Sequence, residues 1–293
     1  MKSALNWRRD GQHWPHAEHS RFIQAGGLRW HVQRMGRGLP VLLLHGTGAS
    51  THSWRGVLPL LANQVEVFAP DLPGHAFTER PAGRGMSLSG MAQAVQSLLN
   101  ETGFAPRVII GHSAGAAIAA QMLLQAPGAT RHLVSLNGAF MPFEGLAGHI
   151  FPTLAKLLFL NPIVPRTLSW GGADTERVIH LLRSTGSEID PEGVALYSQL
   201  LRSPAHVGAV LAMLARWNLE DLWRDLPQLQ CALTLVVGMQ DKAVPPQQAY
   251  SLAARCPQAE VVEMPGLGHL AHEESPSLVI DRLRPALQEL EVA

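Results

Sequence analysis

One stretch decides the fold of this chain, Gly111-His112-Ser113-Ala114-Gly115. It follows an apolar β-branched run, Val108 to Ile110, and precedes an Ala-rich stretch that ends at Gln125, so a serine stands on a turn between a strand and a helix. A serine on so sharp a turn has strained backbone dihedrals, and glycines two residues before and after it remove side-chain clashes. The free N–H groups at the start of the helix can bind a developing anion. The pattern therefore predicts that Ser113 is a nucleophile.

Strands and helices alternate on both sides of this motif. The residue patterns predict a hairpin from 21–24 and 28–32, strands at 41–44, 65–69, 107–110, 132–136, 233–237 and 260–264, and helices at 53–62, 86–102, 116–125, 247–255 and from 275. Strands that are apolar throughout, such as Val41 to Leu44, are typical of parallel strands covered on both faces. The alternation predicts the α/β class, with a mostly parallel twisted sheet, right-handed crossovers and helices on both faces.

The alternation stops after Gly138 and resumes near residue 227. The intervening residues are helical in pattern and rich in Leu, Pro and Trp, so we expect a helical cap inserted over the carboxyl ends of the strands, where open α/β sheets bind ligands. The predicted organisation is an N-terminal surface arm (1–20), the first part of the core (21–138), the cap (139–226) and the second part of the core (227–293).

A serine hydroxyl needs a base to remove its proton, and the base is usually oriented by a carboxylate. On this kind of sheet the chain order is serine, acid, histidine. His269 follows the last predicted strand, and Asp241 follows the strand before it. The other common position for the acid, after the preceding strand, is occupied by Asn137-Gly138, which supplies no carboxylate. We therefore predict Ser113, Asp241 and His269 as the catalytic residues.

The oxyanion of an acyl-transfer reaction needs two preorganised N–H donors. We expect one from Ala114 and the other from Thr47, with Gly48 as the alternative, in the loop that follows Val41 to Leu44. His45 of that loop is expected to be structural. Further residues are predicted to line the substrate pocket: Gly48, Trp54, His112, Phe140 and Met141. The cap also supplies apolar side chains suited to a bulky substrate, although most of these would pack the cap on the core: Phe143, Phe151, Leu157, Leu158, Phe159 and Trp170.

Charge and cysteine content exclude several classes of function. The chain has 23 basic and 23 acidic side chains and no basic run, which argues against nucleic-acid binding. His269 and His272 are three residues apart and do not match a zinc-protease pattern, so we predict no metal and no cofactor. The two cysteines, Cys231 and Cys256, favour a reducing compartment. The first residues lack the apolar core of a signal peptide, and no stretch matches a transmembrane helix, so a cytoplasmic location is predicted.

These motifs, in this order, resemble the α/β-hydrolase superfamily. The matching segments span about residues 20 to 290 and are Leu44-His45-Gly46-Thr47-Gly48, Asp71-Leu72-Pro73-Gly74-His75, Gly111-His112-Ser113-Ala114-Gly115, Asp241 and Gly268-His269. One departure is Ala76, where many members have glycine. The resemblance implies a hydrolase with a Ser-Asp-His triad.

A closer resemblance spans nearly the whole chain. The sequences of 14–20, 27–33, 45–54 and 160–165 resemble the BchO family of magnesium-chelatase accessory proteins of bacteriochlorophyll synthesis. This resemblance implies a photosynthetic bacterium, a tetrapyrrole as a candidate small-molecule substrate, and magnesium-chelatase subunits as candidate partners. It implies no particular reaction.

Three hypotheses follow. The leading one is a serine-dependent hydrolase of an ester or related acyl bond in a bulky apolar substrate. The alternative is a non-catalytic tetrapyrrole carrier, or a binding protein that assists the chelatase, on a hydrolase scaffold. A third is peripheral membrane contact through the stretch from Phe151 to Val164. Dehalogenation and epoxide opening usually need an aspartate at the position of Ser113, so the serine disfavours both.

Overall fold

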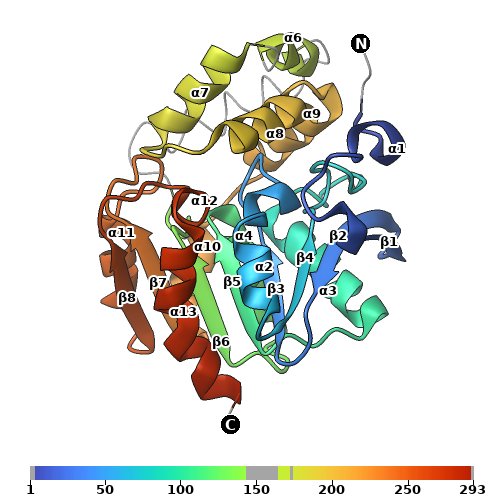
Figure 1. Ribbon diagram of the computed structural model, residues 1–293. Helices are drawn as coiled ribbons and strands as arrows, with labels where there is room; N and C mark the ends of the chain where they lie inside the picture. Colours follow the sequence, from blue (N-terminus) through green and yellow to red (C-terminus); the bar gives the residue numbers. More distant parts are fainter. Residues whose placement is uncertain (1–3, 143–163, 172–173, 292–293) are drawn as a thin grey trace.

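The computed structural model describes residues 4–142, 164–171 and 174–291 (Figure 1). Within these residues a central sheet has the strand order β1-β2-β4-β3-β5-β6-β7-β8. Strand β2 runs antiparallel to its neighbours β1 and β4, and all the other pairs are parallel. The strands are β1 (Ser20–Ala25), β2 (Leu28–Met35), β3 (Pro40–Leu44), β4 (Glu66–Pro70), β5 (Val108–His112), β6 (His132–Leu136), β7 (Ala232–Gly238) and β8 (Ala259–Met264). The predicted mostly parallel sheet and its N-terminal hairpin are confirmed.

Helices cover both faces of this sheet (Figure 1). One face carries α3 (Leu88–Thr102) and α4 (Ala114–Gln125), with α10 (Glu220–Asp225) packed on α4. The other face carries α2 (Val57–Ala62), α12 (Ala271–Glu274) and α13 (Pro276–Glu291), while α11 (Gln247–Ala253) packs on β8. The remaining short elements outside the cap are α1 (Trp7–Asp10) and 3-10 turns at Ala17–His19, Thr51–Trp54 and Leu226–Gln228.

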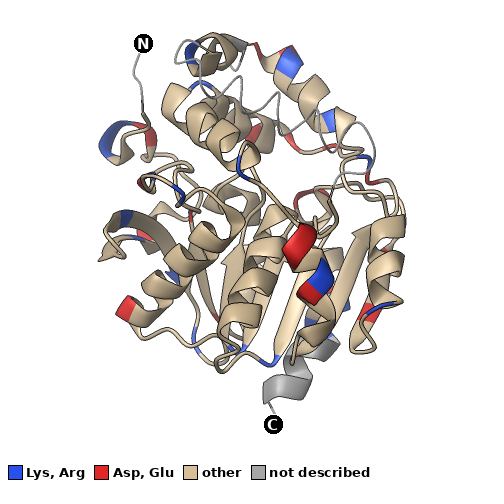
Figure 2. Ribbon diagram, turned by 180° about the vertical axis from the view of Figure 1, so that it is seen from behind, with Lys and Arg blue, Asp and Glu red and all other residues tan. Residues whose placement is uncertain are grey.

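The central strands divide their side chains between two apolar clusters. In β3, Val41 and Leu43 join the cluster on the α2 and α13 side, while Leu42 and Leu44 join the cluster on the α3 and α4 side. This follows from the period of two along a strand, which sends successive side chains to opposite faces. Strands β3, β5, β6 and β7 carry no Lys, Arg, Asp or Glu (Figure 2). Burial on both faces therefore explains why these strands carry no charged side chains.

Between β6 and β7 the chain forms helices that lie over one end of the sheet (Figure 1). These helices are α6 (Val164–Gly171), α7 (Thr175–Ser184), α8 (Pro191–Leu201) and α9 (Pro204–Leu214). Three of them begin with a side-chain cap, in which Asp174, Asp190 and Ser203 accept backbone N–H groups of α7, α8 and α9. Such caps satisfy donors that a helix leaves unpaired at its start. We call α6 to α9 and their connections the cap helices.

The predicted N-terminal surface arm (1–20) is in part buried. Trp14 is 2% exposed and lies in an apolar cluster with Phe77 and with Leu196 and Leu200 of α8. Its indole Nε1 donates to Thr51 Oγ1 over 3.0 Å. The expectation failed because this segment has no periodicity, so its sequence gave no sign of a buried face. It joins the core to the cap helices.

Candidate active site

Ser113 lies on a strained turn between β5 and α4. Its φ is 51° and its ψ is −118°, a positive-φ conformation that is rare for residues other than glycine. A Cβ at Gly111 would lie 2.5 Å from the backbone of Ala116, and a Cβ at Gly115 would lie 2.1 Å from the Leu44 carbonyl oxygen. The two glycines of the motif are therefore required by contacts of the backbone with itself. The serine is presented above the end of the sheet.

Asp241 and His269 form a hydrogen-bonded pair beside this turn. His269 Nδ1 and Asp241 Oδ2 are 2.7 Å apart, and the two side chains are 10% and 0% exposed. Asp241 Oδ1 also accepts the backbone N–H groups of Ala243 and Val244, each over 2.8 Å. The carboxylate is thus fixed by its own loop and can hold one orientation of the imidazole.

Asn137 completes this arrangement. Its Nδ2 donates to Asp241 Oδ2 over 2.7 Å, so the oxygen that faces His269 accepts two donors. Asn137 has a φ of 48°, a left-handed conformation that Asn tolerates better than most residues. This contact is not predicted by the motif, in which position 137 matters only because it lacks a carboxylate. Its location after β6, beside the strand that carries Asp241, was the signal for a contact between the two.

A cavity of about 500 Å³ lies between this end of the sheet and the cap helices. Ser113 and His269 both line it, and so do Thr47, Gly48 and His112. The cap side of the lining consists of Leu168, Arg177, Val178, Leu181, Leu182, Thr185, Tyr197, Leu201, Val207, Val210 and Leu211. Among these described lining residues, only Arg177 carries a permanent charge.

Three predicted pocket residues do not line this cavity. Trp54 is fully buried on the α13 side of the sheet, where its ring lies 4.7 Å from that of His272. Phe140 is 4% exposed and packs in the cluster that contains α4. Met141 is half-buried and is also absent from the lining. Trp54 and Phe140 pack in the apolar clusters of the core instead of facing the cavity.

Of the other apolar side chains expected in the cap, only one belongs to the described residues. Trp170 of α6 is 62% exposed and does not line the cavity. The rest lie outside the described residues: Phe143, Phe151, Leu157, Leu158 and Phe159.

The loop after β3 lies against Ser113, because a Cβ on Gly46 would come within 3.1 Å of Ser113 Cβ. Two histidines hold the carbonyl groups of this loop. His45 Nδ1 donates to the Gly46 carbonyl over 2.8 Å while its Nε2 accepts the Leu72 N–H. His206 of α9 contacts the Gly48 carbonyl through Nε2 over 3.1 Å. Both carbonyl groups that flank Thr47 are hydrogen-bonded, one by His45 of the core and one by His206 of a cap helix. These two bonds fix the conformation of the loop around Thr47.

Burial keeps these histidines neutral near pH 7. It lowers the pKa of His206 to about 4 and lowers the pKa of His45, although the nearby Asp71 acts in the opposite direction on both. Burial, with His272 and His269 beside it, also lowers the pKa of His112 well below 6.5. The Nε2 of His112 donates to the His269 carbonyl over 2.9 Å. His112 therefore supports the backbone of His269 as well as lining the cavity.

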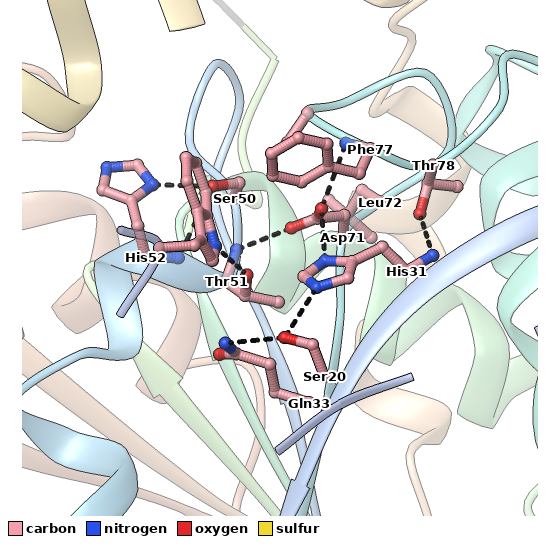
Figure 3. Close-up of polar contacts among 12 residues, drawn as sticks. Ser20, His31, Gln33, Ser50, Thr51, His52, Asp71, Leu72, Phe77 and Thr78 are labelled. Atoms are coloured by element: carbon pink, nitrogen blue, oxygen red, sulfur yellow. Dashed lines mark hydrogen bonds and ion pairs between the residues drawn. The ribbon is translucent and has the colours of Figure 1, made fainter. Parts of the chain in front are cut away.

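A second Ser-His-Asp arrangement lies elsewhere in the molecule (Figure 3). Ser20 Oγ is 3.0 Å from His31 Nε2, and His31 Nδ1 is 2.7 Å from Asp71 Oδ2. Burial would raise the pKa of Asp71, but His31 and the Thr51 N–H outweigh it and hold the pKa at about 2. The His31 and Asp71 side chains are 0% exposed, and none of the three residues lines the cavity. Asp71 therefore acts as a structural acceptor, which also receives the Phe77 N–H.

Among the residues that the structure describes, no group of three or more His, Cys, Asp or Glu is arranged to hold a metal ion. In the same part of the chain, no helix combines the length and apolarity needed to cross a membrane.

The fold and this site define the class of protein. Residues 40–276 match the family model of the alpha/beta hydrolase fold, and the chain belongs to that family. Over 262 residues it is 37% identical to the Magnesium-chelatase 30 kDa subunit of Rhodobacter capsulatus, a match that covers 89% of this chain and 91% of that protein. Both parts of the predicted resemblance are thereby confirmed.

More distant relatives share the fold. Haloalkane dehalogenase 2 of Mycobacterium bovis is 26% identical over 280 residues, covering 92% of this chain and 94% of that protein. The solved structure of a thermophilic esterase from Thermogutta terrifontis superposes with a TM-score of 0.75 at 23% identity, covering 93% of this chain and 99% of that one. Since relatives on this fold carry different activity names, function must be argued from the site.

Proposed function

We propose that this protein is a serine hydrolase that cleaves an ester or related acyl bond in a bulky apolar substrate. Ser113 attacks the carbonyl carbon, and His269 takes the hydroxyl proton and delivers it to the leaving group as the acyl-enzyme forms. A water molecule that gives its proton to His269 then attacks the acyl carbon, and that proton returns to Ser113 Oγ as the acid is released. Asp241 orients His269 and stabilises its protonated form. The backbone N–H groups of Ala114 and Thr47 hold the oxyanion.

One observation carries this proposal: Ser113, on its strained turn, and His269, paired with Asp241, line the same cavity. A hydrolase needs its nucleophile and base to share a space in which a reacting carbonyl can sit. The Ser20, His31 and Asp71 arrangement has hydrogen-bonded partners but no such space among the described pockets. The cavity therefore favours Ser113.

The substrate class follows from the lining. The cap side of the cavity is built mostly from Leu and Val, and its volume of about 500 Å³ falls within the range of small-molecule sites. Burial of apolar surface in such a site contributes about 25 cal/mol per Å² before the costs of binding. We expect the acyl or alcohol part to be large and apolar.

The first experiment is labelling with a fluorophosphonate probe, which reacts with activated serines. We expect wild type to label, Ser113→Ala to be silent, and Ser20→Ala to label like wild type. Ser20→Ala is a matched control because it removes the serine of the second arrangement. In an ester assay Ser113→Ala should lose turnover by on the order of 10⁴-fold or more. Labelling that survives in Ser113→Ala, or disappears in Ser20→Ala, would overturn the proposal.

The similarity to a protein named as a magnesium-chelatase subunit supports a second candidate function. In this alternative the cavity binds a tetrapyrrole and presents it to the chelatase without hydrolysis. Absorbance titration with protoporphyrin tests it. A carrier predicts equal binding by wild type and Ser113→Ala, no ester turnover, and loss of binding in Val178→Glu, which places a charge in the cavity wall. Absence of binding by wild type would exclude this alternative.

Two further proposals concern location. Cys231 and Cys256 are both free and buried, which supports a reducing, cytoplasmic compartment. The stretch proposed for peripheral membrane contact lies outside the described residues except for Val164. Co-sedimentation with liposomes tests it, and absence of pelleting would exclude it.

A further inference from the structure

The connection between cap helices α7 and α8 lies directly against the loops that carry Asp241 and His269. We call Thr185, Gly186 and Ser187 the brace. The Lys242 N–H, next to Asp241, donates to the Thr185 carbonyl over 3.0 Å. A Cβ on Gly186 would lie 1.9 Å from the Gln240 carbonyl oxygen, and Gly186 has a φ of +88°. The brace thus contacts the loop that carries Asp241 at both neighbours of that residue.

The brace contacts the loop that carries His269 through the hydroxyl of Ser187. The Leu270 N–H donates to Ser187 Oγ over 2.8 Å, and Ser187 Oγ donates to Glu274 Oε1 over 2.7 Å. Glu274 Oε1 also accepts the Gly268 N–H over 2.8 Å. The backbone groups on both sides of His269 are therefore held by Ser187 and Glu274. Ser187 is 0% exposed, so water cannot replace its hydroxyl without a local rearrangement.

We infer that Ser187 is a positioning residue: acting from the cap, it sets the geometry of the Asp241–His269 pair. This inference rests on the proposed function for its catalytic readout. Thr185, like Val178 and Leu182 of α7, lines the cavity, whereas Ser187 does not. The brace therefore connects the cavity wall at Thr185 with the loops that carry Asp241 and His269.

The test uses Ser187→Ala with Ser184→Ala as its matched control. Ser184 is exposed at the end of α7, and its hydroxyl bonds only within that helix turn. Misplacing a catalytic group by a fraction of an ångström to 1 Å costs about 10- to 100-fold in rate. We expect Ser187→Ala to lower kcat by about that factor with KM nearly unchanged, since Ser187 is not in the cavity wall. Ser184→Ala should behave like wild type.

A spectroscopic readout separates this inference from the proposed function. The Nδ1 proton of His269, bonded to a carboxylate, gives a far-downfield proton resonance that Asp241→Asn removes. Ser187→Ala should shift or broaden it even if the protein hydrolyses nothing. If Ser187→Ala fails to fold, Glu274→Ala should lower kcat and alter the resonance in the same way. Glu274→Gln keeps an accepting oxygen, so it should retain most of the wild-type kcat. An unchanged resonance and an unchanged kcat in Ser187→Ala or Glu274→Ala would overturn the inference, whatever the fluorophosphonate result.

Discussion

Replacing Asn137 by Asp should turn a stabilising contact into a repulsive one. The Asn137 amide nitrogen lies 2.7 Å from Asp241 Oδ2, and Asn137 is 3% exposed. In Asn137→Asp a second carboxyl occupies that position, with charge centres about 4 Å apart. At an effective dielectric of ~20 the repulsion between two such charges is about 4 kcal/mol. This corresponds to a rise of about 3 pKa units, so one proton of the pair should titrate near pH 7.

The stability change can be read from the pH dependence of Tm. The unfolded variant has lost this proton by pH 6, while the folded pair retains it until about pH 7, so the variant loses stability as pH rises. Between pH 6 and pH 8 the loss is about 1.4 kcal/mol, or roughly 3 °C in Tm. Taking the difference between variant and wild type at each pH cancels the other titrating groups.

Asn218→Asp is the matched control. Asn218 is exposed, and its side chain accepts the Glu220 N–H at the start of α10, a bond that Asp retains. We expect no fall in Tm relative to wild type between pH 6 and pH 8 for this variant. A pH-independent Tm difference for Asn137→Asp, or one equal to that of Asn218→Asp, would refute the close pairing of the side chains at positions 137 and 241.

Two further predictions concern the core and the buried histidines. Gly115→Ala should cost more than about 3 kcal/mol or prevent folding, because its Cβ would meet the Leu44 carbonyl oxygen. Gly208 of α9 is the control, because a Cβ there would make only ordinary contacts. Gly208→Ala should raise the free energy of unfolding by up to about 1 kcal/mol and so raise Tm slightly. Equal Tm changes in Gly115→Ala and Gly208→Ala would contradict this prediction. Burial lowers the pKa of His206 to about 4 and of His272 to about 3, so the unfolded chain binds more protons below pH 6.5. Stability should fall by about 2 kcal/mol per histidine from pH 7 to pH 5, and a Tm that is equal or higher at pH 5 would contradict it.

Much of the fold was predictable because its signals are local. The period of two in β3, the glycines around Ser113 and the alternation of strand and helix all reflect constraints within a few residues. The hairpin of β1 and β2 followed from two short runs joined by Gly26-Gly27, whose φ values are both positive. Trp54 is predicted in the pocket but lies in the core, because no local sequence signal shows whether an aromatic side chain faces the core or the cavity.

The supporting contacts of the site were not predictable for the same reason. Ser187 bonds to Leu270 across 83 residues of sequence, and His206 reaches Gly48 across 158. Neither residue belongs to a motif, because each acts on a backbone group and needs only a hydroxyl or a ring nitrogen at the right place. A sequence can identify the residues of a reaction by their chemistry, whereas the residues that align them depend on how distant segments pack.

Two physical features distinguish the proposed catalytic Ser113 from the serine of the second Ser-His-Asp arrangement. Ser20 and His31 are 3.0 Å apart beside a fully buried Asp71, so hydrogen-bond geometry alone would select them. Ser20 and His31 lie on an ordinary pair of strands, and neither lines the cavity that Ser113 and His269 share. Ser113 instead has a strained backbone and a cavity beside it. Proteins retain strain where surrounding contacts enforce it, and empty space where a ligand can fill it. Strain and space, rather than the identity of the three side chains, are therefore the physical basis for proposing that Ser113 is the nucleophile.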